Sequence, residues 1–261
     1  MRPGRLTIVG TGFVAAGQTT LEALSYMQGA SKLFYLVSDP VTTYWLRGLN
    51  PTAESLADAY ANGRPREKSY EQMVERILAP VRAGEEVCAA FYGHPGVFVD
   101  PSHEAVARAR REGHAARMLP GISAEDCLYA DLGLDPGENG CQSFEATDFL
   151  VHRRRFDPRS LLVLWQIGAI GVLTFRPGSL WSRKGLRVLV EELSRRYRPN
   201  HEVLIYEASP FPVCPPRMER LPLSRLARAA VTLASTLVVP PTREVRSDPD
   251  MLEKLGLEPS E

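Results

Sequence analysis

The chain has 261 residues, enough for one large domain or for two modest ones that each have a core. Apolar residues make up 44% of it and charged residues 24%, as in ordinary globular proteins. Basic and acidic residues both number 31, and the resulting formal net charge of zero argues against nucleic acid or an anionic membrane as an obligatory partner.

The sequence also argues against a membrane, secreted or metal-containing protein. No apolar run approaches the roughly 20 residues that span a bilayer, and a strand-like segment begins at once without a signal peptide, so we expect a cytoplasmic protein. Four scattered cysteines without a CxxC pair fit a reducing compartment, and five histidines without ligand spacing predict no metal site.

Short apolar runs recur along the chain and are predicted to be strands. They are nearly continuous in apolar residues rather than alternating, as in strands that are buried on both faces of a mainly parallel sheet. These predicted strands are Leu6–Val9, Leu33–Val37, Val87–Tyr92, Leu161–Gln166, Val203–Tyr206 and Thr236–Val239.

Helical patterns lie between these runs. The capping box at 19–22 predicts a helix to Ala30, and Ser69-x-x-Gln72 predicts the start of another, with a kink or an early end at Pro80. Strands and helices alternate, so the fold class is α/β. Further helices are expected after the cap Ser102 and along the apolar stripe Leu186, Leu189, Val190, Leu193 and Tyr197.

Two domains and a tail are expected. Turn-forming residues place a boundary near Pro120-Gly121, or within the stretch 135–140. We divide the chain into an N-terminal α/β domain over 1–120, a C-terminal α/β domain over 121–242 and a charged tail over 243–261.

A glycine pattern follows the first predicted strand. Gly10-Thr-Gly12-Phe-Val-Ala15 satisfies the dinucleotide pattern G-x-G-x-x-[GA], and Asp39 stands roughly where a ribose-binding acid should. However, the next helix begins only at Thr19, which would leave a pyrophosphate without a helix N-terminus. Three interpretations stay open, namely a nicotinamide or flavin site, a tight turn beside a cleft, and a loop near another nucleotide-like ligand.

A more specific loop follows the third predicted strand. In Tyr92-Gly-His-Pro-Gly-Val-Phe98 two glycines flank His94-Pro95, so the backbone can approach a ligand closely while the proline stiffens the turn. The loop has no lysine and no Walker pattern, which makes it poorly suited to a triphosphate. Tyr92, Val97 and Phe98 suit a flat aromatic ring, such as the adenine of a nucleoside that carries a positive sulfonium.

Several segments together resemble the borosin α-N-methyltransferases of the tetrapyrrole-methylase superfamily. The resemblance covers most of 5–170, continues more loosely to about 240, and is most specific in YGHPGVFV, MLPGISAEDCL and EATDFL. It implies two α/β domains with mainly parallel sheets and a cofactor cleft between them. It also implies methylation of backbone amides in a ribosomally made peptide, with S-adenosylmethionine as the donor and S-adenosylhomocysteine as the product.

The resemblance assigns residues to the cofactor and to catalysis. Tyr60, Arg66 and Tyr70 match the family's catalytic patch, and we assign Tyr70 as the base, Arg66 as its electrostatic partner and Tyr60 as an orienting hydrogen bonder. The family has a further tyrosine where this chain has Ala57, which bears on the proton-handling network, the rate or the substrate. The expected cofactor contacts are Tyr92, His94, Val97, Phe98, Ser123, Ala124, Gln166, Ala208, Ser235 and Thr236.

The substrate and partners are also expectations from the resemblance. Some family members carry their substrate as a C-terminal extension, whereas the end of this chain, 243–261, is short and charged, so we expect a separate precursor peptide. Family members tend to dimerise, and a homodimer or a complex with the precursor is expected. The basic run His152–Arg155 is either a site for an acidic leader or a solvated loop.

Three other functions remain. A methylase of tetrapyrroles or other small molecules would not need the tyrosine and arginine patch, because such a substrate activates its own ring carbon. A non-catalytic module that binds S-adenosylmethionine is compatible with Ala57. A nicotinamide oxidoreductase rests on the glycine pattern alone.

Overall fold

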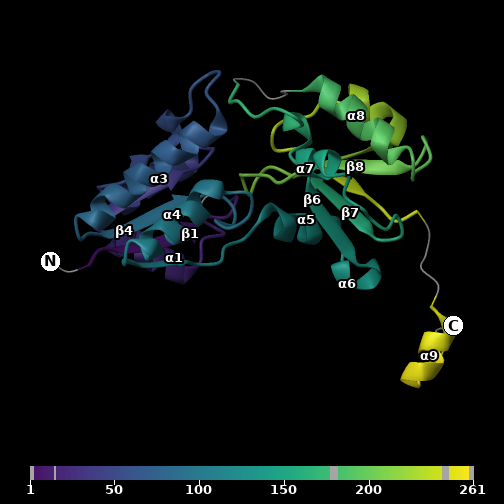
Figure 1. Cartoon of the computed structure of the whole chain (residues 1–261), viewed down its shortest axis with the longest axis horizontal. Coiled ribbons are helices and arrows are strands. Elements are labelled where there is room, and N and C mark those ends of the chain that lie inside the picture. The colour runs from purple at the N-terminus through teal and green to yellow at the C-terminus, as the bar shows by residue number, and fades with distance from the viewer. Residues whose placement is uncertain (1–2, 15, 177–181, 243–246, 259–261) are drawn as a thin grey trace. The chain divides into compact units, whose positions relative to one another are not determined.

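The computed structural model describes residues 3–14, 16–176, 182–242 and 247–258 (Figure 1). The chain divides into two compact units. The division falls after Leu134, in the turn-rich stretch, and so differs from the division drawn at 120/121. The first unit is Met1–Leu134 with Val172–Gly178 and Glu207–Arg217, and the second is Asp135–Gly171, Ser179–Tyr206 and Met218–Glu261.

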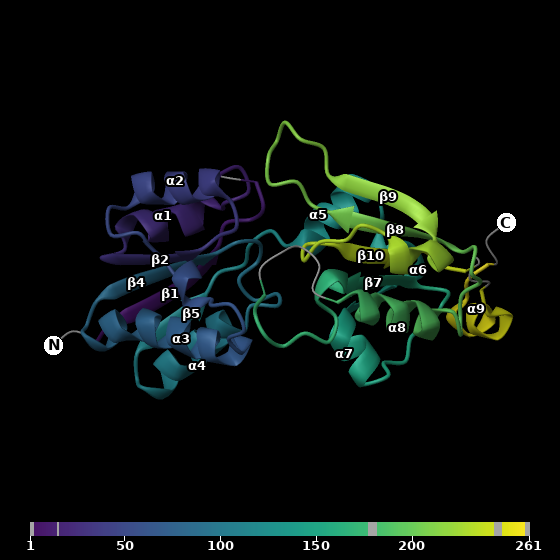
Figure 2. The same ribbon diagram turned by 90° about the horizontal axis from the view of Figure 1, so that it is seen from above.

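The first unit is built on a sheet whose strand pairs are all parallel. Its strand order is β3-β2-β4-β1-β5, with Leu6 of β1 level with Val87 of β4. Helices α1 and α2 cover one face and α3 and α4 the other, as Figure 2 shows. The elements are β1 (Arg5–Gly10), α1 (Leu21–Gly29), β2 (Lys32–Leu36), α2 (Pro40–Leu49), β3 (Glu54–Ser55), η1 (Ala57–Ala59), α3 (Arg66–Arg82), β4 (Glu86–Phe91), α4 (Asp100–Arg111), β5 (Ala115–Met118) and α5 (Ala124–Leu132).

The core of the first unit explains why its strands are continuously apolar. Alternate residues of β4 face opposite helical layers. Ala89 and Phe91 pack in the cluster that includes Ile77 of α3, while Cys88 and Ala90 pack in the cluster that includes Met27 of α1. Because both faces are covered, neither set of positions is polar, and the strand appears in the sequence as an unbroken apolar run.

The second unit has a mixed sheet. Its order is β6-β7-β10-β8-β9, with β6 parallel to β7 and β10 antiparallel to both β7 and β8. The α/β class is confirmed, whereas mainly parallel pairing holds only for the first unit, because a buried run looks the same in either direction. The elements are α6 (Pro136–Asn139), β6 (Cys141–Glu145), α7 (Ala146–Val151), β7 (Leu161–Trp165), η2 (Ile167–Ala169), α8 (Arg183–Leu193), β8 (Glu202–Glu207), β9 (Arg217–Pro222), η3 (Leu223–Arg228), β10 (Thr236–Val239) and α9 (Pro249–Leu255).

All six predicted strands are confirmed, and the four that the sequence did not predict lie at the sheet edges. β3, β5, β6 and β9 end the two strand orders, and each contains partly or fully exposed residues. An edge strand is covered incompletely and lacks the apolar run of an interior one. No helix within the described ranges is long and apolar enough to cross a membrane.

Three of the predicted helix starts were wrong by a few residues. α1 is capped by Thr20, whose side chain accepts from Ala23 N at 3.1 Å, while the Thr19 hydroxyl donates to Thr11 O instead. α3 begins at Arg66, so Ser69 lies inside it and is fully buried. α4 begins at Asp100, and the hydroxyl of Ser102 donates to Val99 O at 2.7 Å from within its first turn.

Two further expectations about helices have clear outcomes. Pro80 lies within the last turn of α3, which continues to Arg82, so the helix does not end early. Its ring removes one N–H from the helical ladder, and the helix continues for two residues beyond it. The stripe expected at 186–197 is confirmed, because Leu186, Leu189 and Leu193 are all buried in the core of the second unit.

Replacing Leu189 by alanine should lower the free energy of unfolding by about 2–5 kcal/mol, because the fully buried side chain leaves a cavity in the core. Urea unfolding followed by circular dichroism measures the loss. Val188→Ala is the matched control on the same helix, since Val188 is 41% exposed, and it should change stability by less than about 0.5 kcal/mol. Equal effects of the two substitutions would contradict the orientation of α8.

Candidate active site

Three glycines bring the loops after β1, β4 and β5 into backbone contact. The N–H of Gly93 donates to Gly12 O at 2.8 Å, and the N–H of Gly12 donates back to Gly93 O at 3.3 Å. A Cβ on Gly10 would lie 2.3 Å from Gly93 O, and a Cβ on Gly121 would lie 3.2 Å from the same atom. These loops leave the carboxyl ends of parallel strands, where open α/β sheets bind their ligands.

The loop after β1 does not offer its N–H groups to a pyrophosphate. The side-chain oxygen of Gln18 accepts from Phe13 N at 2.7 Å and from Val14 N at 3.1 Å. Asp39 caps α2 by accepting from Thr42 N at 2.7 Å. Ala15, the last position of the glycine pattern, lies outside the described residues. Two features favoured a dinucleotide site, and both have local structural roles. The glycine pattern forms a tight turn, and Asp39 is a helix cap.

The loop after β4 presents an apolar surface on a fixed turn. Tyr92 N donates to Leu36 O at 3.0 Å, and Nδ1 of His94 accepts from Gly96 N at 2.9 Å. Phe98 has a φ of 56°, a strained value for a bulky residue and one that is common at functional sites. Tyr92, Val97 and Phe98 are 43%, 41% and 49% exposed, so large apolar side chains face outward at the strand ends.

The expected contacts at Ser123 and Ala124 fall at the start of α5. Ser123 is the N-cap and forms a complete capping box with Asp126, with N–O distances of 2.7 and 3.2 Å. Ser123 is buried beside Gly121, at the same strand ends as the loop that contains Tyr92. Ser123 therefore has a structural role as a helix cap, and its contact with a cofactor stays a prediction.

The remaining cofactor candidates are divided between the units. Ala208 lies in the segment Glu207–Arg217 of the first unit. Gln166, Ser235 and Thr236 lie in the second unit, where Gln166 directly follows β7 and has a φ of 58°. There Ile167 N donates to Ser235 O at 3.2 Å, so the positions after β7 and before β10 are neighbours. Their contact with a cofactor stays a prediction.

Tyr60, Arg66 and Tyr70 come together in the first unit. The rings of Tyr60 and Tyr70 meet edge to face with centroids 6.4 Å apart. Arg66 and Tyr60 both act to lower the pKa of Tyr70, whereas Tyr70 acts to raise that of Tyr60. Of the two phenols, Tyr70 is therefore the one better suited to hold a negative charge, and its role as the base stays a prediction.

Burial and charge act against each other on these phenols. Burial raises the pKa of Tyr70, and the Arg66 guanidinium and the hydrogen bond from Tyr60 only partly offset this effect. Burial also raises the pKa of Tyr60, and the neighbouring phenols of Tyr70 and Tyr92 raise it further. Tyr60 therefore remains a hydrogen-bond donor at neutral pH. Tyr70 needs Arg66 if it is to accept a proton.

Tyr92 connects the glycine loop to this patch. Its phenol is crowded by protein atoms although the residue is 43% exposed, and burial raises its pKa, with a further contribution from Tyr70. The ring of Phe13 contacts Tyr92 edge to face at 6.2 Å. The loop expected to bind the cofactor and the patch expected to handle the proton are therefore near enough in the first unit for their phenols to influence one another.

The structure adds a strap that the sequence did not indicate. Residues 172–175 run antiparallel to 63–66, with Gly63 N donating to Phe175 O at 2.9 Å and Arg66 N donating to Leu173 O at 3.1 Å. Nη2 of Arg66 donates to Val172 O at 3.1 Å. The Phe175 ring stacks on Tyr60 with centroids 5.1 Å apart. The strap therefore fixes two of the three patch residues.

Two other expectations concern the surroundings of the patch. Ala57 begins η1 and is exposed, so the missing tyrosine of the family corresponds to a surface position of this turn.

Among the described residues, no three His, Cys, Asp or Glu side chains converge as metal ligands would. His94 has one ring nitrogen bonded within its own loop.

Sequence comparison shows the family. Residues 5–209 match the family model of the tetrapyrrole (corrin/porphyrin) methylases. The chain belongs to this family, whose members are methyltransferases that take the methyl group from S-adenosylmethionine.

Similar proteins are known from several fungi. The chain is 41% identical to the methyltransferase/ribosomally synthesized cyclic peptide dendrothelin A precursor of Dendrothele bispora, over 99% of this chain and 63% of that protein. It is 42% identical to the corresponding omphalotin A precursor of Omphalotus olearius, with the same coverage. For the gymnopeptides precursor of Gymnopus fusipes the identity is 43%, over 97% and 61%. The chain thus spans less than two thirds of these relatives.

Solved structures share the fold at low identity. Uroporphyrin-III-C-methyltransferase from Thermus thermophilus superposes with a TM-score of 0.64 at 21% identity, covering 92% of this chain and 93% of that one. Cobalt precorrin-4 methyltransferase gives 0.64 at 16% identity, covering 90% and 94%. These similarities establish the architecture.

Replacing Arg66 by methionine should raise the pKa of Tyr70 further, because the guanidinium is the largest contribution that lowers it. A pH titration of tyrosinate absorbance measures the change, with Tyr70→Phe used to assign the transition. Arg66→Lys keeps the charge and should leave the pKa closer to that of the unaltered protein. An unchanged titration in Arg66→Met would show that the two groups do not interact.

Proposed function

We propose that this chain transfers the methyl group of S-adenosylmethionine to backbone amide nitrogens of a ribosomally made peptide. The observation that carries the proposal is the patch of Tyr60, Arg66 and Tyr70, in which the two tyrosine rings meet edge to face at 6.4 Å and the strap at 172–175 holds Arg66. Membership of the methylase family and the printed names of the fungal relatives support it.

The residues at the strand ends suit the methyl donor. S-adenosylmethionine supplies an electrophilic methyl group on a positively charged sulfur. Tyr92, Val97 and Phe98 offer exposed apolar surface for an adenosyl group, and the described loop carries no Lys or Arg that would repel a sulfonium. The close backbone contact at Gly10, Gly93 and Gly121 holds this surface in place.

The patch can activate the peptide nitrogen that accepts the methyl group. A peptide nitrogen is a poor nucleophile, because its lone pair is delocalised into the carbonyl group. The phenolate of Tyr70, which Arg66 stabilises, accepts the amide proton and becomes a neutral phenol, and Arg66 then stabilises the negative charge on the imidate oxygen. Tyr60 holds Tyr70 in orientation through its hydroxyl. The new N–C bond forms as the methyl group leaves sulfur, and S-adenosylhomocysteine is the other product.

The separate precursor remains a prediction from the sequence. The fungal relatives are named as methyltransferase and precursor in one chain, and this chain spans 63% of two of them. We propose a substrate supplied as a second chain. Intact-mass measurement of the purified protein tests this point, since a ladder of methyl additions on its own residues would contradict it.

With S-adenosylmethionine and a peptide encoded beside its gene, the chain should add methyl groups that fragmentation mass spectrometry places on backbone nitrogens. Tyr70→Phe should slow this reaction by about 10²–10⁴-fold, because the proton acceptor is lost. Affinity for S-adenosylhomocysteine, measured by calorimetry, should change less than about twofold because Tyr70 does not form the adenosyl surface.

Tyr44→Phe is the matched control for this prediction, since Tyr44 is 83% exposed on α2, and it should keep full activity. Two results would contradict the proposal. One is cofactor binding without any methyl transfer to peptide, which would favour a non-catalytic module or another acceptor. The other is full activity in Tyr70→Phe, which would remove Tyr70 from the mechanism.

A further inference from the structure

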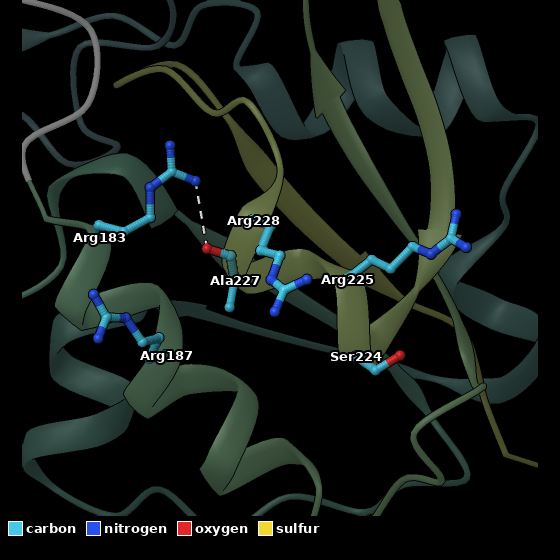
Figure 3. A pocket seen from close by; sticks show the side chains of 6 residues that line it. All are labelled: Arg183, Arg187, Ser224, Arg225, Ala227 and Arg228. Atoms are coloured by element: carbon cyan, nitrogen blue, oxygen red, sulfur yellow. Dashed lines mark hydrogen bonds between the residues drawn. The ribbon is translucent and has the colours of Figure 1, made fainter.

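A basic pocket lies in the second unit between α8 and η3. It has a volume of about 880 Å³ and is lined by Arg183, Arg187, Ser224, Arg225, Ala227 and Arg228 (Figure 3). Four of these six side chains are guanidinium groups, and none is acidic or aromatic. None of the six belongs to the candidate active site.

The packing of the two elements turns these arginines outward. Leu186 and Leu189 of α8 are buried in the core, which leaves Arg183 and Arg187, one turn apart, on the outer side. Leu223 and Leu226 of η3 are buried in the same core. The intervening positions, Ser224, Arg225 and Arg228, are therefore exposed or half-buried around the same space.

These arginines lack the carboxylate partners that other arginines of the chain have. Arg82 and Arg108 each bind two or more glutamates in the first unit. Within the described ranges, none of the four pocket arginines forms an ion pair, and Arg183 donates to the carbonyl oxygen of Ala229 at 2.8 Å. The first turn of α8 contains no acid either, so its N-terminal dipole adds to the positive potential.

Arginines also outnumber acids beside the pocket. A neighbouring pocket shares Arg225 and Arg228 with it and is lined in addition by Glu219 and Arg220. Arg220 is paired with Glu202 at 2.8 Å. The basic run that the sequence suggested as a leader site is different, because Arg154 and His152 both bind Asp148. The pocket between α8 and η3 is therefore the stronger candidate for an anionic partner.

We infer that this pocket binds a carboxylate-rich segment of the peptide substrate, outside the residues that are methylated. The inference rests on the proposed function. Planar guanidinium groups bind carboxylates through paired N–H donors, and several of them spread over an open pocket suit several acidic side chains better than a single ion. The pocket lacks an aromatic side chain on which a nucleic-acid base could stack.

Such a contact would tether the substrate. An acidic segment held at the pocket raises the effective concentration of the adjoining residues at the active site without taking part in the chemistry. Loss of the pocket should therefore raise KM for a peptide that includes the acidic segment, while kcat at saturation stays unchanged. A peptide without the segment should be insensitive to the same change.

Fluorescence anisotropy with the full chain tests the inference directly. The probe is a fluorescein-labelled peptide that alternates Glu with Ser, and its comparison is the same peptide with Gln in place of Glu. Arg187→Glu/Arg228→Glu should weaken binding of the Glu peptide by about tenfold or more, because attraction becomes repulsion. Arg196→Glu/Arg198→Glu makes the same change in net charge at two exposed positions and should weaken binding less than about twofold.

Three results would overturn the inference. The Glu peptide could bind no more tightly than the Gln peptide, the two double variants could weaken it equally, or a single-stranded oligonucleotide could bind more tightly at the same salt concentration. A further variant, Asp248→Asn/Asp250→Asn/Glu253→Gln, removes negative charge from the chain's own tail and tests whether that tail occupies the pocket. A gain of about tenfold in affinity would assign the pocket to that tail and contradict a separate peptide.

Methylation assays keep this inference distinct from the proposed function. If the unaltered chain binds the Glu peptide at the pocket but methylates no peptide, the proposed function fails and the pocket remains an anion-binding site. If methylation proceeds and the pocket variants leave KM unchanged, the tether fails and the function stands. A raised KM with unchanged kcat supports both.

Discussion

The backbone of Gly10 lies too close to that of Gly93 to allow a side chain, Gly121 packs tightly against both, and the rest of the candidate site depends on this contact. Parallel strands end at one edge of the sheet, so the loops after β1, β4 and β5 have to pass each other there. The paired hydrogen bonds between Gly12 and Gly93 fix the start of the following turn. That turn presents Tyr92 to the phenol patch and holds Phe98 in a strained conformation.

Electrostatics then decides which phenol can act. Desolvation raises the pKa of both Tyr60 and Tyr70, so burial alone would make the patch inert at neutral pH. The asymmetry comes from the neighbouring groups, because Tyr70 raises the pKa of Tyr60, whereas Tyr60 and the Arg66 guanidinium lower that of Tyr70. Arg66 can do so because the strap at 172–175 holds its backbone and its side chain. The patch is therefore maintained by a segment that is far away in the sequence.

The sequence predicted the parts of the fold that burial determines. All six interior strands were recognised, because strands covered on both faces form unbroken apolar runs, whereas the edge strands β3, β5, β6 and β9 are too exposed for this pattern. The patch residues came from a family resemblance, the loop at Tyr92 was recognised from its glycines and apolar side chains, and the structure places both in one unit. The strap could not be predicted, since the pairing of 172–175 with 63–66 and the stacking of Phe175 on Tyr60 have no local signal. The basic pocket likewise depends on the packing of α8 against η3.

The central claim is that Tyr70 removes the amide proton with the help of Arg66. Its most direct test is the single-turnover rate of peptide methylation as a function of pH. Because the pKa of Tyr70 is raised above its ordinary value, the phenolate fraction should increase about tenfold per pH unit below that pKa, and the rate should rise with it. Tyr70→Phe should abolish this rise. A rate that does not depend on pH, or one whose rise survives in Tyr70→Phe, would contradict the account.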